Sequence, residues 1–127
     1  MTSYTATTEG ITVTAQPIYL DGQSDILNHK FTFAYIIRIT NYRDEDVQLL
    51  RRHWYIEDGN NAVKEVEGEG VVGQQPLIKS GTSHEYNSFC VIETFQGSME
   101  GTYLMRDTGG VEFSIRIPRF VLTAASN

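Results

Sequence analysis

A glycine-rich tract, Gly68-Glu69-Gly70-Val71-Val72-Gly73, matches the G-x-G-x-x-G string of dinucleotide-binding proteins. That chemistry needs a strand before the tract and a helix N-terminus after it, because backbone amides and the helix dipole hold the pyrophosphate. The segment that follows here, Gln74-Gln75-Pro76-Leu77-Ile78, has no amphipathic helical pattern, and proline has no amide to donate. The string alone therefore does not predict a nucleotide site.

Acidic residues alternate just before and within the tract, where they would place negative charge beside an incoming phosphate. They are Glu65, Glu67 and Glu69. The tract also lacks the Lys-Ser/Thr pair of a P-loop. We therefore favour a bulged, architectural loop in which small residues allow close backbone approach. The alternative is an anion-binding nest for a pyrophosphate-containing nucleotide, with or without a divalent cation. Its candidate ligand-binding residues are Gly68, Gly70 and Gly73.

Metal-ligating residue types occur without a metal-binding spacing. The histidines His29, His53 and His84 lie in separate segments, and no Cys/His pattern accompanies them. Asp44-Glu45-Asp46 lacks the spaced ligands and central glycine of an EF-hand loop. We predict no metal site and no cofactor, and we expect Asp44–Asp46 to be a solvated turn.

Nucleophile candidates lack recognisable partners in the sequence. No nucleophile elbow is present, and no base is evident for the serines Ser80, Ser83 and Ser88, although a triad assembled in space stays open. The single cysteine, Cys90, lies in an apolar stretch and is expected to be a buried, inert thiol. We predict a protein that is not an enzyme and has no catalytic residues.

The elements that position these residues have a period of two. Alternating apolar residues predict strands over 11–19, 31–40, 47–58, 63–69, 86–92, 98–106 and 111–122, with turn signals such as Asp58-Gly59-Asn60-Asn61 between them. About seven antiparallel strands without helices predict an all-β sandwich, of immunoglobulin or fibronectin-III type.

Three aromatic residues have distinct expected roles. Trp54 alternates with Leu50 and Ile56 and is expected at the centre of the core, whereas Tyr55 faces the other way with His53, as a candidate contact surface. Tyr86 follows a turn into a strand, which resembles the tyrosine corner of Greek-key sandwiches.

Size and charge limit the classes of partner. A chain of 127 residues is about one domain, and we expect a flexible leader over 1–10, one domain over 11–123 and a short tail over 124–127. The net charge of −6 and the absence of a basic run argue against nucleic acid and anionic membranes as partners. No secretory signal or membrane span is evident, so a cytoplasmic location is expected.

Longer segments carry a family resemblance. They are Arg52–Gly59, Gly68–Pro76, Gly97–Gly101 and Phe113–Phe120. In these segments, and across most of 11–122, the chain resembles the bacterial ApaG family. The resemblance implies a fibronectin-III-like sandwich and an association with cobalt and magnesium resistance. Related domains in eukaryotic F-box proteins and in a DNA-polymerase-interacting protein imply protein–protein binding, with the partner unidentified. The family brings no catalytic residues, and its glycine tract has been regarded as a pyrophosphate site.

Overall fold

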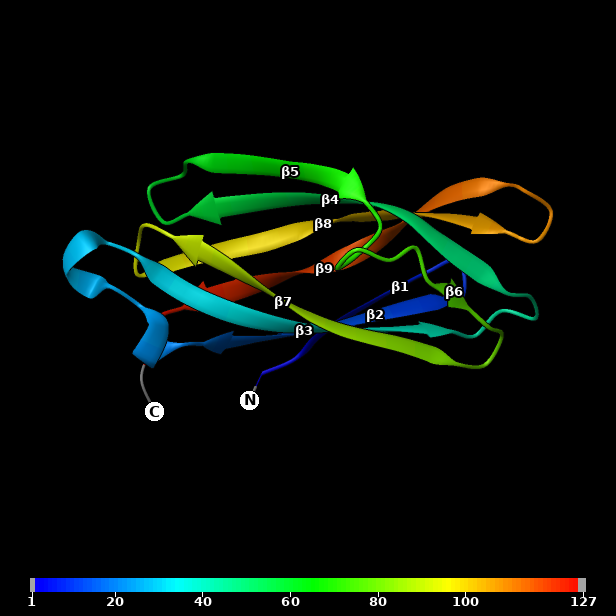
Figure 1. Cartoon of the computed structure of the whole chain (residues 1–127), viewed down its shortest axis with the longest axis horizontal. Coiled ribbons are helices and arrows are strands. Elements are labelled where there is room, and N and C mark those ends of the chain that lie inside the picture. The colour runs from blue at the N-terminus through cyan, green and yellow to red at the C-terminus, as the bar shows by residue number, and fades with distance from the viewer. Residues whose placement is uncertain (1, 126–127) are drawn as a thin grey trace.

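The computed structural model describes residues 2–125 and builds them almost entirely from strands (Figure 1). The strands are β1 (Tyr4–Thr8), β2 (Ile11–Tyr19), β3 (Phe31–Asn41), β4 (Val47–Asp58), β5 (Val63–Glu69), β6 (Leu77–Ile78), β7 (Ser83–Ile92), β8 (Gln96–Asp107) and β9 (Glu112–Thr123). Two single 3-10 turns, η1 (Asp21–Gln23) and η2 (Ile26–Asn28), lie between β2 and β3. Neither is long enough to cross a membrane, and no other helix occurs in 2–125.

The strands form two antiparallel sheets that pack face to face. One sheet has the order β1-β2-β3-β7, and the other has the order β5-β4-β8-β9 with β6 paired to β4. Figure 1 shows the two layers, with β5 and β7 both on the side nearer the viewer. The predicted all-β sandwich is confirmed, because alternating strands can bury one face of each sheet.

The core lies between the sheets, and Trp54 is at its centre as predicted. Only 2% of this residue is exposed. Its ring contacts three other aromatic rings, drawn from both sheets, and these belong to Tyr35, Tyr103 and Phe120. The contacts with Tyr103 and Phe120 are edge-to-face, and such contacts add to the free energy gained from apolar burial.

The predicted flexible leader over 1–10 is wrong for most of its length. Tyr4–Thr8 form β1, which pairs with Ile11–Ala15 of β2. Threonine-rich segments lack apolar alternation, yet threonine is a good strand former, and Tyr4 packs on Phe120. In the predicted tail, the Ala124 amide donates to the Phe95 carbonyl; residues 126–127 lie outside the described residues.

A bulge in β4 corrects the predicted face of Leu50. The register against β8 shifts between Leu49 and Arg51, so Leu49 is fully buried and Leu50 only partly. A bulge inserts one extra residue, which reverses the alternation beyond it. Uniform alternation along the sequence cannot reveal this shift.

Tyr86 does not form the predicted tyrosine corner. Its hydroxyl hydrogen-bonds the hydroxyl of Tyr103 on the opposite sheet, rather than a nearby backbone group. Burial raises the pKa of both phenols above the usual value. The pair is therefore a buried link between β7 and β8, since buried hydroxyls need hydrogen-bond partners.

Candidate functional site

The glycine tract forms a tight turn at the end of β5. The Val71 amide donates to the Gln74 carbonyl over 2.8 Å, and the Gln74 amide donates to the Val71 carbonyl over 3.0 Å. Between them Val72 and Gly73 have φ angles of +48° and +76°. Two central residues with positive φ are typical of a type I′ hairpin turn, where glycine and asparagine are usual and valine is rare.

Two glycines of the tract differ in how strictly the structure requires them to be glycine. A Cβ on Gly70, whose φ is +64°, would lie 2.1 Å from the Gln74 carbonyl oxygen. A Cβ on Gly68 would lie 2.8 Å from the Arg52 guanidinium. The backbone of Gln74 cannot move aside for a side chain on Gly70, whereas the Arg52 guanidinium is the end of a flexible side chain and can shift.

The polar groups of the tract are largely engaged within the protein. The Gly70 amide donates to the Leu50 carbonyl over 2.8 Å, and Arg52 donates to the carbonyls of Glu69 and Gly70 over 3.0 Å each. No α-helix begins after the tract in the described residues. This geometry favours the architectural interpretation, while ligand binding by Gly68, Gly70 and Gly73 stays a prediction.

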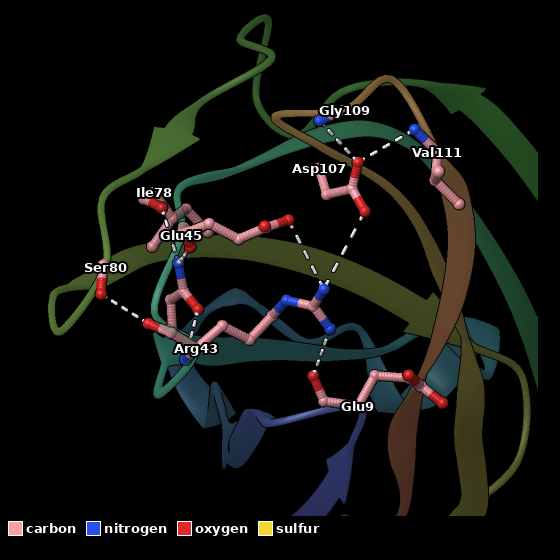
Figure 2. Close-up of polar contacts among 9 residues, drawn as sticks. Glu9, Arg43, Glu45, Ile78, Ser80, Asp107, Gly109 and Val111 are labelled. Carbon is pink, nitrogen blue, oxygen red and sulfur yellow. Dashed lines mark hydrogen bonds and ion pairs between the residues drawn. The ribbon is translucent and has the colours of Figure 1, made fainter.

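Glu45, in the acidic turn Asp44–Asp46, belongs to a polar cluster at one end of the sandwich (Figure 2). Asp46 accepts the Ser80 amide over 2.8 Å, and the Ser80 hydroxyl donates to the Arg43 carbonyl. The fully buried Asn41 donates from its amide nitrogen to the carbonyls of Glu45 and Ile78. These bonds fix the loop after β3 to the segment between β6 and β7.

Arg43 connects the same loop to two further turns. Figure 2 shows its guanidinium between Glu9, Glu45 and Asp107. It donates to the Glu9 carbonyl over 2.9 Å and lies 3.6 Å and 4.0 Å from the two carboxylates. The guanidinium also stacks on Phe113, 4.9 Å from the ring centroid. Because its charge is already compensated, Arg43 has a structural role rather than that of an anion receptor.

Cys90 has the properties expected of an inert thiol. It lies on β7 with its side chain toward the opposite sheet, and burial raises the pKa of its thiol to about 12. A thiolate is the reactive form. The neutral thiol at physiological pH is therefore a poor nucleophile.

The histidines do not cluster with one another. His29 ends η2 in a left-handed conformation, and His84 lies on β7. His53, on β4, lies beside Glu65 and Glu67 of β5. Sequence spacing does not reveal this group, because Glu65 and Glu67 lie twelve and fourteen positions after His53. The signal that could reveal it is the Asp58–Asn61 turn, which fixes the register of the β4–β5 hairpin.

An open groove runs between the edge strands of the two sheets. Within residues 2–125, β7 pairs only with β3 and β5 pairs only with β4, so no strand of this part of the chain covers either edge. On the other side of the sandwich β9 packs against β1 and β2. The groove encloses about 400 Å³. Its lining combines apolar residues with the two cations Arg52 and Lys64. The apolar part includes Ile56, Val66, Cys90 and Val91.

Comparison with known proteins identifies the family. Residues 21–107 match the family model of the ApaG domain. The chain is 48% identical over 119 residues to Protein ApaG of Paramagnetospirillum magneticum and 44% identical over 119 residues to Protein ApaG of Brucella suis. Each alignment covers 94% of this chain and 92% of the relative.

A solved structure shows the same fold. The crystal structure of a Bordetella pertussis protein named ApaA superposes with a TM-score of 0.87 at 43% identity, covering 89% of this chain and 92% of that one. The matched family model and these relatives extend over both sheets of the sandwich. The chain belongs to the ApaG family.

Proposed function

We propose that this protein is a non-enzymatic binding module that takes up an extended segment of a partner protein along β7. The observation that carries the proposal is the free β7 edge beside an apolar groove. An edge strand presents unpaired N–H and C=O groups, to which an extended segment can add as a further strand.

The two edges of the groove differ in their protection against pairing. β5 carries alternating charges at Lys64, Glu65, Glu67 and Glu69, which discourage strand addition. From Tyr86 to Ile92, β7 has no charged residue, no proline and no break in its register with β3. This half of β7 is therefore the edge best suited to accept another strand.

Exposed apolar side chains border the same part of β7. Phe89 is 57% exposed and Val91 is 50% exposed, whereas the next residue, Ile92, is buried. Partly buried Ile56 and Val66 extend the apolar surface across the groove. Exposed apolar side chains beside a free strand edge are typical of an interaction site.

The charges of the groove define the partner further. Arg52 and Lys64 line it, and neither forms an ion pair within residues 2–125. They stand out on a chain of net charge −6. We therefore expect a partner segment that alternates apolar residues with at least one carboxylate, because complementary charge orients a partner and favours its association. A cytoplasmic location stays a prediction from the sequence, and a link to cobalt and magnesium resistance stays a prediction from the family resemblance.

The test is selection of peptides from a random library on the full chain, followed by affinity measurement on variants. Val91→Lys places a charge on the proposed edge, and Val111→Lys makes the same change in the distant β8–β9 turn, where valine is also exposed. We expect selected peptides to be apolar and acidic, and Val91→Lys to weaken them by about tenfold or more. Val111→Lys should leave their affinity unchanged.

Two outcomes would overturn this proposal. One is a set of peptides that bind Val91→Lys as well as the unsubstituted chain. The other is a self-association that forms at micromolar concentration and is abolished by Val91→Lys, since the occupant of the edge would then be a second copy of this chain.

A further inference from the structure

A histidine and two glutamates come together on the outer face of the β4–β5 hairpin, away from the groove. His53 Nε2 lies 2.6 Å from Glu65 Oε1, and His53 Nδ1 lies 2.9 Å from Glu67 Oε1. One donor atom from each side chain lies within 4.8 Å of the other two. The three side chains could therefore hold one ion if both glutamates turn toward the same ring nitrogen of His53.

The strand register holds the three residues together. His53 is directly opposite Glu67, and Tyr55 is directly opposite Glu65. Side chains opposite each other in an antiparallel pair project from the same face. The Tyr55 ring stacks on the His53 ring at 4.6 Å between centroids and an angle of 24°, which fixes the orientation of the imidazole.

The charge of the group is not balanced by its own members. Two carboxylates leave a net charge of −1 if the imidazole is protonated and −2 if it is neutral. On the same face Glu69 is directly opposite Arg51, so these two charges offset each other and the negative charge of His53, Glu65 and Glu67 remains. A divalent cation would neutralise this cluster, whereas an anion would be repelled.

We propose that His53, Glu65 and Glu67 form a binding site for a divalent transition-metal ion of the Zn²⁺ class. One imidazole nitrogen with carboxylate oxygens is a donor set that suits such ions, while Mg²⁺ and Ca²⁺ prefer oxygen alone. All three side chains are accessible, with exposures of 25% for His53, 57% for Glu65 and 56% for Glu67. Water would complete the coordination, as in open zinc sites.

The test is a calorimetric titration of the full chain, free of any histidine tag, with Zn²⁺. We expect saturable binding of one ion per chain. His53→Gln, Glu65→Gln and Glu67→Gln should each weaken it by about tenfold or more, as loss of a ligand or of the group that orients a ligand does. The nitrogen resonances of the His53 ring should shift on addition of Zn²⁺.

Matched controls separate a site from general attraction to an acidic surface. Glu100→Gln removes a charge from the same face, and His84→Gln makes the same histidine substitution on β7. Both should keep the affinity within about threefold. The proposal is overturned if Zn²⁺ shows no saturable binding up to about 1 mM, or if the three variants bind like the controls. His53 would then only join the two carboxylates through its ring nitrogens. Peptide binding at β7 is a separate property and would survive either result.

Discussion

The backbone conformation at each position decides which residues of the glycine tract must be glycine. Gly70 has a positive φ and no room for a Cβ, whereas Gly73 has a positive φ with nothing within 4 Å of a Cβ. The sequence could show that small residues are needed here. It could not show that Gly70 is constrained by contact and Gly73 by φ alone, because that depends on where the turn places the Gln74 carbonyl.

Replacing Gly70 and Gly73 by alanine separates the two constraints. Gly73→Ala should lower the free energy of unfolding by about 1 kcal/mol, the cost of a left-handed residue with a Cβ. Gly70→Ala should cost about 3 kcal/mol, because the same strain is joined by a clash with the Gln74 carbonyl. Urea denaturation measures both. Equal costs would mean that the turn does not need this close approach.

The same engaged backbone predicts the response of the tract to anions. Pyrophosphate added to millimolar concentration should leave the amide resonances of residues 68–73 unchanged, because the Gly70 and Val71 amides are bonded internally and carboxylates lie nearby. NMR titration provides the measurement. Saturable shifts confined to these amides would instead support the nucleotide alternative.

At the scale of elements, alternation predicted six of the nine strands nearly to their observed bounds. β1 could not be predicted from alternation, because Tyr4–Thr8 is threonine-rich rather than apolar. It pairs with β2 because the chain reverses at Glu9 and Gly10, which both have a positive φ. The groove was missed for another reason. Its sides come from β5 and β7, which are adjacent in neither sequence nor sheet, so only the sheet order places them together.

Arg43 is expected to stabilise the end of the sandwich by connecting three turns. Arg43→Ala should lower the free energy of unfolding by about 2 kcal/mol, because two partly buried carboxylates lose their counter-charge and Phe113 loses its stacked cation. Arg38→Ala is the matched control, since its ion pair with Glu85 is exposed and should contribute less than about 0.5 kcal/mol. Similar losses for both variants would rule out this role for Arg43.

At the scale of the whole molecule, buried tyrosine hydroxyls and the buried thiol make the free energy of unfolding depend on pH in the alkaline range. Tyr35, Tyr86, Tyr103 and Cys90 all have a pKa raised by burial. In the unfolded chain these groups lose protons at lower pH than in the folded protein, so the unfolded state gains stability as pH rises past the unfolded values near 9 and 10.

The resulting pH dependence has a definite sign. The contribution of these groups to the free energy of unfolding should be fully present below about pH 8, and it should decrease through pH 9–12. Chemical denaturation at a series of pH values measures it. Stability that is constant or rises across this range would contradict the burial of the tyrosine pair.

The central claim, strand addition at β7, is tested most directly by amide hydrogen exchange of the chain with and without a selected peptide. In the free protein, the amides of Tyr86–Ile92 that are not bonded to β3 should exchange quickly, as they do on an exposed edge. Peptide binding should slow those amides and leave the edge of β5 unchanged. Protection of β5, or of neither edge, would contradict the account.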